Sequence, residues 1–411
     1  MTQIAGDTAA VSLSKPGGGG PGGGLVDAAR DRLRRGDLGS IPVAVGLVAI
    51  AIVFSALNPH FLSAENLTNL ALQMAATGTI ALGIVLVLLL GEIDLSAGSV
   101  SGLSAVAMTL LYTHAGWNPW LAVAGALVTG GVVGLIHGLM RTYLSMPSFV
   151  VTLAGLIGWQ GLMLFLLGSE GTINLPFDRG IAQLSDTWMA PWMGWLIVAL
   201  LAAGHLIATL VTRTLRQRAG LSVTAPAWVA VRSGGLAMVL AIAVVVLNSD
   251  RGVPLTLVIF SGLVVVLDLV LRRTVIGRRI YAVGGNAEAS RRAGISVTKV
   301  RIMVFVGCSV LAATGGILAA SRLAAVNQSS GGSDILLNAI AAAVIGGTSL
   351  FGGRGRAYAA LLGILVIQSI TNGMLLLNVD SSVRFMVTGA VLAIAVAIDS
   401  LARRGAADGL K

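Results

Sequence analysis

Residues 272–301 read RRTVIGRRIYAVGGNAEASRRAGISVTKVR, the longest polar and strongly basic stretch in a chain that is otherwise almost entirely apolar. Within it, residues 286–294 carry the signals of a short, separately capped helix. Asn286 suits the N-cap, because its side-chain oxygen can accept from free N–H groups, and Glu288 follows where the helix dipole favours an acid. Gly294 can take the left-handed conformation that ends a helix. We predict that another protein binds this small charged helix.

Long apolar runs flank this stretch on both sides. Hydrophobic residues make up 56% of the 411-residue chain and charged residues only 11%, whereas soluble domains have about 25% charged residues. Apolar runs of roughly 17 to 24 residues suit helices that cross a bilayer, so the sequence predicts an all-α, polytopic helical membrane protein with about 10–12 transmembrane helices. The predicted spans are 41–57, 67–90, 97–113, 120–139, 149–167, 192–211, 226–247, 254–271, 301–320, 335–352, 357–377 and 384–402.

The distribution of arginine sets the expected orientation of these spans. Short cytoplasmic loops of membrane proteins carry an excess of Lys and Arg, and here arginines precede the first span and follow the last, while acids dominate the loops at the other end. We therefore expect both termini in the cytoplasm. Residues 1–40, which include KPGGGGPGGG, are expected to form a disordered, Gly-rich and basic tail, and residues 41–411 the transmembrane domain.

Two short polar segments interrupt the apolar runs without forming an ordinary loop. Residues 91–101, GEIDLSAGSVS, place two acids between adjacent runs, and residues 345–356, IGGTSLFGGRGR, place glycines and hydroxyl groups there. Irregular backbone at membrane depth is tolerated only where it is buried in protein or lines a cavity. Both segments are therefore predicted to be broken or re-entrant elements.

Polar side chains in or beside the spans are candidates for a translocation path or gate. An acid near the bilayer centre costs on the order of 2.5 to 3.5 kcal/mol on insertion scales, so it usually faces a cavity or a partner. Capping of the following helix explains Asp94 equally well. Amides and hydroxyls suit a neutral polyol, although hydrogen bonds between helices explain any single residue. The candidates are Glu92, Asp94, Ser96, Gln73 and Asn338.

The sequence lacks the residues that ATP hydrolysis and metal binding need. A phosphate-binding loop has lysine directly after glycine, but Lys15, Lys299 and Lys411 follow other residues. One cysteine, Cys308, and four scattered histidines give no metal-ligand spacing. We therefore expect no enzymatic activity, no metal and no cofactor in this chain. The net charge of +10 is dispersed at the ends of apolar runs, which indicates membrane topology and not nucleic-acid binding.

Three motifs make the chain resemble the permease subunits of bacterial ABC importers for monosaccharides, a group that also includes the branched-chain amino acid permeases. The motifs are GEIDLSAGSVSGL at 91–103, GRRIYAVGGNAEASRRAGISV at 277–297 and AIAAAVIGGTSLFGGRG at 339–355. The resemblance implies a sugar permease in the bacterial inner membrane, in contact with lipid. ATP would be bound by separate subunits in the cytoplasm. An added pair of spans around 192–247 is similar to the xylose-type members, which implies D-xylose or a related pentose.

The resemblance also implies roles for particular residues. In that family the second motif docks in a groove of the ATP-binding subunit, and the matching positions here are Gly285, Asn286, Glu288, Ala289, Arg291, Arg292 and Gly294. An ATPase dimer presents two grooves and this chain has one such helix, so a permease homodimer is expected. A periplasmic sugar-binding protein would dock on the outer face, with Arg179, Arg251, Arg322 and Arg384 as candidate contacts.

Three other functions stay open at this point. One is a proton- or sodium-coupled secondary transporter with Glu92 and Asp94 as its ion site, which would leave the charged helix at 286–294 without a task. Another is a branched-chain amino acid permease of the same family. A membrane scaffold would leave the intramembrane polar groups without a function, and it predicts no uptake.

Overall fold

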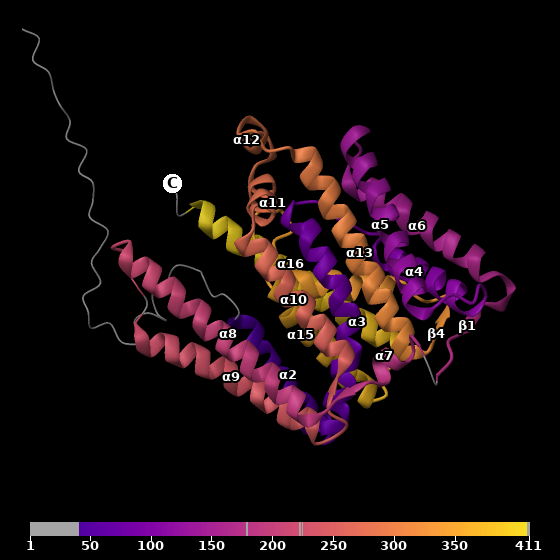
Figure 1. The fold of residues 1–411 in the computed structure, drawn as a ribbon, viewed down its shortest axis with the longest axis horizontal. Helices are drawn as coiled ribbons and strands as arrows, with labels where there is room; N and C mark the ends of the chain where they lie inside the picture. The colour runs from indigo at the N-terminus through magenta and orange to yellow at the C-terminus, as the bar shows by residue number, and fades with distance from the viewer. Residues whose placement is uncertain (1–40, 178–179, 222, 224, 409–411) are drawn as a thin grey trace, which may run out of the picture.

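The computed structural model describes residues 41–177, 180–221, 223 and 225–408, and in this part the chain is almost entirely helical (Figure 1). Each predicted span overlaps one apolar helix, which confirms the all-α, polytopic architecture. The predicted tail at 1–40 lies outside the described residues. The apolar helices are α2 (Ile41–Leu57), α3 (Ala64–Leu89), α4 (Ala97–Thr113), α5 (Pro119–Tyr143), α6 (Ser148–Leu167), α8 (Pro191–Arg218), α9 (Pro226–Asn248), α10 (Leu255–Arg273), α13 (Val297–Leu323), α14 (Ser333–Ile345), α15 (Ala357–Leu376) and α16 (Ser381–Asp408).

Eight helices of the described chain are long and apolar enough to cross a membrane, namely α3, α5, α6, α8, α9, α10, α13 and α15. The described apolar stretches of α2, α4, α14 and α16 are shorter. Shorter elements connect the long ones: the 3-10 helix η1 (Gly168–Glu170), α7 (Gln183–Asp186), α11 (Val275–Gly285) and α12 (Ala287–Arg292).

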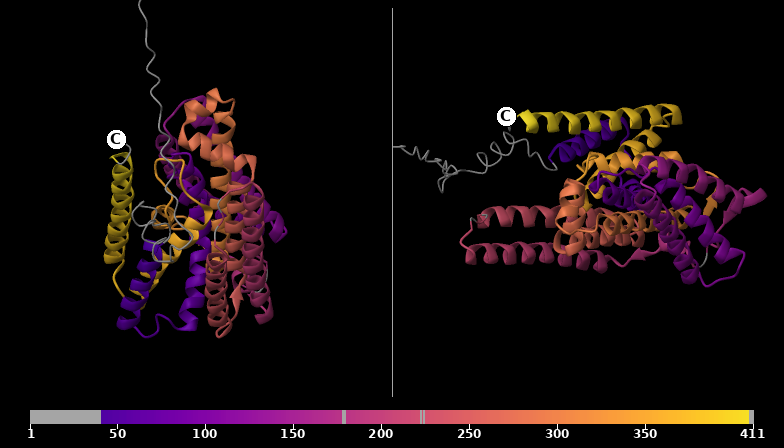
Figure 2. Two further views of the ribbon diagram at one scale, coloured as in Figure 1. Left: turned by 90° about the vertical axis from the view of Figure 1, so that its left-hand side faces the viewer. Right: turned by 90° about the horizontal axis from the view of Figure 1, so that it is seen from above.

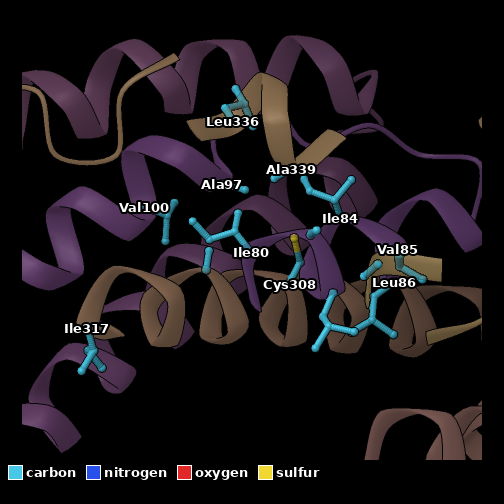
Figure 3. Packing of buried hydrophobic residues seen from close by; sticks show 14 of the residues in the cluster. Ile80, Ile84, Val85, Leu86, Ala97, Val100, Cys308, Ile317, Leu336 and Ala339 are labelled. Carbon is cyan, nitrogen blue, oxygen red and sulfur yellow. The ribbon is translucent and has the colours of Figure 1, made fainter. Parts of the chain in front are cut away.

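Helix α3 forms the centre of the bundle. In its most apolar stretch of 18 residues, 83% of the residues are buried, whereas the figures for α8 and α9 are 11% and 17%. Such burial is expected for a helix that is apolar on every side. Its side chains Ile80 and Ile84 pack with Cys308 of α13 and Ala339 of α14 (Figure 3). The interior of the molecule is therefore built by α3 together with α13, α14 and α15.

The hairpin of α8 and α9 projects from one side of the bundle, whereas α16 lies along another edge with α2 beside it (Figures 1 and 2). Two paired strands, β2 (Trp188–Met189) and β3 (Val253–Pro254), close the base of the α8–α9 hairpin. A second antiparallel pair joins β1 (Thr172–Asn174) to β4 (Ala325–Asn327). The sequence analysis did not predict these short strands, which tie loops together at the end of the bundle opposite α12.

One predicted span is wrong in its length. A helix was expected over 335–352, but α14 ends at Ile345 after 13 residues, which is about 20 Å of helix against roughly 30 Å of bilayer hydrocarbon. The cause lies in the two glycines that follow. Gly346 packs so tightly on α15 that a Cβ atom would lie 1.8 Å from the Ala359 carbonyl oxygen, and Gly347 has a φ of +99°. Residues 346–356 continue as irregular backbone, in agreement with the predicted broken element.

Candidate functional site

Helix α12 lies exposed at one end of the bundle, next to α11 (Figure 1). Asn286 Oδ1 accepts a hydrogen bond from the Ala289 N–H at 2.9 Å. Glu288 pairs with Arg291 at 2.9 Å and with Arg292 at 3.2 Å. These contacts and the φ of +80° at Gly294 confirm the predicted capped helix. The candidate coupling residues, all exposed, are Gly285, Asn286, Glu288, Ala289, Arg291, Arg292 and Gly294.

The sequence analysis missed α11, the helix that joins α10 to α12. Thr274 caps its first turn by accepting from the Gly277 N–H at 3.2 Å, and Ile280 is buried on its inner side. A threonine followed by apolar residues at helical spacing was the signal that could have revealed it. The Tyr281 hydroxyl donates to the Gly355 carbonyl oxygen at 2.8 Å. Burial raises the pKa of Tyr281, so the hydroxyl keeps the proton that this bond needs.

The C-terminal end of α11 touches the end of α3 and the 346–356 segment. Gly284 approaches the end of α3 so closely that a Cβ atom would lie 1.8 Å from the Leu89 carbonyl oxygen and 2.9 Å from the Gly353 nitrogen. The Gly353 N–H donates to the same Leu89 carbonyl at 2.9 Å. The turn after α3, the 346–356 segment and the helix before α12 therefore meet backbone to backbone at Leu89.

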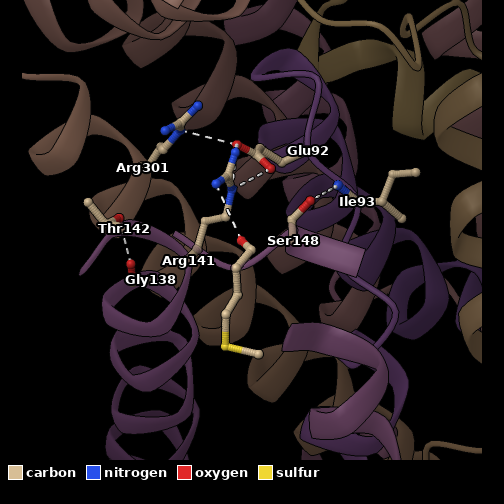
Figure 4. Close-up of polar contacts among 8 residues, drawn as sticks. Glu92, Ile93, Gly138, Arg141, Thr142, Ser148 and Arg301 are labelled. Carbon is tan, nitrogen blue, oxygen red and sulfur yellow. Dashed lines mark hydrogen bonds and ion pairs between the residues drawn. The ribbon is translucent and has the colours of Figure 1, made fainter. Parts of the chain in front are cut away.

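Glu92, in the turn between α3 and α4, is buried between two arginines (Figure 4). Arg141 at the end of α5 donates through Nε to both carboxylate oxygens, at 3.0 and 2.9 Å. Arg301, in the second turn of α13, places its Nε 3.1 Å from Oε1, an ion-pair contact without hydrogen-bond geometry. One carboxylate thus ties the turn to α5 and α13.

A chain of hydrogen-bonding groups continues from Asp94 into the bundle. The Trp159 Nε1–H donates to His137 Nε2 at 2.9 Å. An indole nitrogen can only donate, so Nε2 must accept and the ring proton lies on Nδ1, which faces Ser96 Oγ at 3.4 Å. Ser96 in turn donates to Asp94 Oδ1 at 2.6 Å, and the Ser96 N–H donates to the same oxygen at 2.8 Å. Asp94 therefore orders the residue that precedes α4.

His137 and Trp159 are the members of this chain that sequence reasoning missed. The partners of His137 are Ser96, just before α4, and Trp159 of α6, both distant in the sequence. The available signal was that an ionisable residue lies inside the predicted span 120–139. Of the described residues, no group of three or more His, Cys, Asp or Glu side chains is placed to hold a metal ion.

Gln73 lies away from the acids, in a polar contact between α3 and α15. Its Oε1 accepts from Gln368 Nε2 at 2.7 Å. One end of the same interface holds Asn66 and Asn372, which exchange hydrogen bonds of 2.8 and 3.0 Å. Such pairs contribute about 0.6 kcal/mol each on average in membrane proteins. The contacts hold α15 in register against the central helix.

Asn338 lies in a third place, a pocket of about 330 Å³ between α14, α15 and α16. The structure therefore brings Glu92, Asp94 and Ser96 together but separates them from Gln73 and Asn338.

The candidate docking arginines have different surroundings. Arg251 pairs with Asp250 at 3.0 Å, donates to Asn69 at 2.8 Å and stacks over Trp188. Arg322 is exposed at the end of α13. Arg384 donates to Ser381 and lines the pocket that holds Asn338. Arg179 lies outside the described residues.

The chain is similar to known transport permeases. The family described as "Branched-chain amino acid transport system / permease component" matches residues 66–396. The xylose transport system permease protein XylH of Escherichia coli (strain K12) is 36% identical over 364 residues, covering 87% of this chain and 91% of that protein. XylH of Haemophilus influenzae is 32% identical over 365 residues, covering 88% and 96%.

Ribose permeases are similar as well. The ribose import permease protein RbsC of Bacillus subtilis (strain 168) is 33% identical over 355 residues, which cover 86% of this chain and 91% of that protein. No solved structure matches the chain.

Proposed function

The chain belongs to the family of branched-chain amino acid transport system permease components, and from this premise we propose that it is the membrane-spanning subunit of an ATP-driven monosaccharide importer. D-xylose or a related pentose is the proposed cargo, because relatives that align over most of the chain are named as xylose and ribose permeases. The observation that carries the proposal is the exposed, charged helix α12, which is joined through Gly284 to the end of α3 and to the 346–356 segment.

The proposed mechanism is mechanical. Two ATP-binding subunits in the cytoplasm hold α12 of two permease copies and bind it differently in their open and closed states, since only a difference in affinity can shift a conformational equilibrium. Displacement of α12 moves Gly284 and Arg301 together, and these residues contact the turn after α3 at Leu89 and Glu92. The broken segments at 91–101 and 345–356 would move with them. This movement would open the translocation path first to one side of the membrane and then to the other.

The proposed orientation places α12 and both termini in the cytoplasm of a bacterial inner membrane. Arg291, Arg292, Arg141 and Arg301 all lie at the α12 end, and an excess of positive charge is typical of the cytoplasmic side. A sugar-loaded binding protein would dock at the opposite end.

A paired substitution tests the coupling role of α12. Glu288→Ala with Arg291→Ala removes an exposed ion pair, which contributes about 0–1 kcal/mol, so the protein should insert and fold. Uptake of labelled xylose into vesicles that contain the ATPase and binding-protein partners should fall to background while ATP hydrolysis persists. Asp268→Ala with Arg272→Ala removes a similar pair just before α11 and serves as the matched control. Normal uptake by the α12 variant contradicts the proposal.

The same assay separates the alternatives. A secondary transporter would take up sugar with an ion gradient and without ATP, but both Glu92 oxygens are engaged by arginine, which argues against a proton or sodium site there. A branched-chain amino acid permease would be revealed by ATP-dependent uptake of leucine and none of xylose. A scaffold would show no uptake under any of these conditions.

A further inference from the structure

The surface where α14 meets α16 carries more polar side chains than is usual for helices of this apolar bundle. The pocket between them is lined by Asp334 and Asn338 of α14, Thr371 of α15, and Arg384 and Thr388 of α16. Charged and amide groups are costly against lipid and therefore mark a cavity or a protein partner. The polar side chains of this lining therefore indicate a cavity or a protein partner at this place.

Two groups of opposite charge share this pocket without pairing. No cation of the described residues lies within ion-pairing distance of Asp334, and no hydrogen bond engages its carboxylate there. Arg384 donates through Nη2 to Ser381, but its buried Nε has no acceptor. The pocket thus offers the Asp334 carboxylate as an acceptor and the guanidinium of Arg384 as a donor. Amide and hydroxyl groups of Asn338 and Thr371 lie in the same lining.

A sugar satisfies such a lining better than a single ion does. Each hydroxyl of a sugar both donates and accepts, so adjacent hydroxyls can donate to Asp334 and accept from Arg384. The side chains of Leu337 and Phe385 supply apolar surface for the carbon skeleton. The volume of about 330 Å³ falls within the range of about 300–1,000 Å³ that small-molecule pockets occupy, and apolar walls with a few polar groups are typical of them.

We propose that this pocket is a subsite for the hydroxyl groups of a monosaccharide in the half of the membrane opposite α12. From Ser381 to Leu392 the lining of α16 spans 12 residues, or about 16 Å between the first and last along the helix, so the pocket reaches from the end of the bundle well into it. The assignment rests on the proposed function, because it names where the transported sugar is held. A sugar released at that end of the bundle would meet it first.

Protection of an introduced cysteine tests the subsite directly. Cys308, the only cysteine of the sequence, is buried in the core, so a polar thiol reagent reaches only an added one. In the full-length purified protein, Asn338→Cys reports on the pocket, and Thr388→Cys serves if the first variant does not fold. Ser249→Cys, exposed at the end of α9 and outside the pocket, is the matched control.

D-xylose and D-ribose are the probes, titrated against a non-hydroxylated osmolyte at equal concentration. A sugar at ten times its dissociation constant occupies most sites, so modification of Asn338→Cys should slow about tenfold, while Ser249→Cys is unaffected. An unchanged rate at Asn338→Cys and Thr388→Cys, or equal slowing at Ser249→Cys, overturns the subsite.

Transport measurements keep this inference separate from the proposed function. In the assembled transporter, Asp334→Asn should lower uptake about tenfold by removing a charged acceptor, with stimulation of ATP hydrolysis retained. Asp186→Asn, at an exposed acid outside the pocket, should leave uptake unchanged. Wild-type protein that takes up sugar with ATP but shows no protection refutes the subsite alone. Protection without ATP-dependent uptake refutes the importer and leaves the subsite standing.

Discussion

At the scale of single residues, the clearest feature is the unequal charge balance around Glu92. One buried carboxylate faces Arg141 and Arg301, which come from two helices on either side of the turn. A buried ion pair costs desolvation when it forms, but removal of one partner is far more damaging because it leaves an uncompensated charge. Glu92 therefore has a structural role in holding α5 and α13 to the turn, whatever part it has in gating.

Glu92→Gln should destabilise the protein strongly. Fully buried pairs lose about 3–5 kcal/mol when one partner is removed. We expect about 2–3 kcal/mol here, because Arg141 and Arg301 keep 20% and 21% exposure and can reach water. The check is thermal unfolding of detergent-solubilised protein. The control is Glu288→Gln, which breaks an exposed ion pair on α12 and should cost about 0–1 kcal/mol. Equal melting temperatures for the two variants would contradict the structural role of Glu92.

The sequence identified the acids of this site but not their partners. Glu92 and Asp94 stand out because acids are rare in apolar runs, and this signal is local. Arg141 and His137 lie more than 40 positions away, as the separations of 49 and 41 residues in their contacts show. Only the packing of α5 against the turn brings them close, and hydropathy carries no such information.

At the scale of elements, the junction of α11 with the broken segments is the part of the molecule best placed to transmit motion. At Gly284 the contacts are between backbones and leave no side chain to absorb a displacement, because Gly284 lies directly on Leu89 and Gly353. Close-packed contacts of this kind pass on a shift instead of damping it.

Gly284→Ala should disrupt this junction, and Gly262→Ala in α10 should not. A Cβ atom at Gly284 would lie 1.8 Å from the Leu89 carbonyl oxygen, whereas one at Gly262 would meet nothing within 4 Å. Since rigid backbone must then move, we expect a loss of about 1–3 kcal/mol in stability, as for other overpacked sites, together with lost sugar uptake. Melting curves and vesicle uptake of the two variants measure this. A normal Gly284→Ala protein would show that the contact transmits nothing.

The long helices could be predicted from the sequence. The places where helices end or are interrupted could be predicted only in part. Runs of apolar residues locate the long helices because bilayer thickness imposes a length that few other structures share. The end of α14 was misjudged, since it depends on the contact of Gly346 with α15, which a local stretch of sequence does not reveal, and on the positive φ of Gly347. α11 was missed because its polar, arginine-rich sequence resembles a loop.

At the scale of the whole molecule, α13 connects the two ends. It begins just after α12 and leads through β4 to α14, where the polar pocket lies. Its 27 residues make about 40 Å of continuous helix. A tilt imposed at the α12 end is therefore carried to the pocket end by one rigid rod.

The predicted orientation is open to a labelling experiment on intact cells. Ser249→Cys lies at the pocket end and Ala293→Cys beside α12, both exposed. A membrane-impermeant thiol reagent should modify the first in intact cells and the second only after permeabilisation, because arginine-rich ends stay in the cytoplasm. The opposite pattern would invert the proposed topology.

The short α14 also has a consequence for how the protein is made. A segment of 13 helical residues with an acid in its first turn is a poor substrate for insertion as an independent unit. The backbone that follows finds its partners on Leu89 and Tyr281, which are synthesised earlier, and on α15, which is synthesised later. This region can therefore be completed only after α15 has been made, so substitutions there should be tested first for failure of assembly and only then for failure of transport.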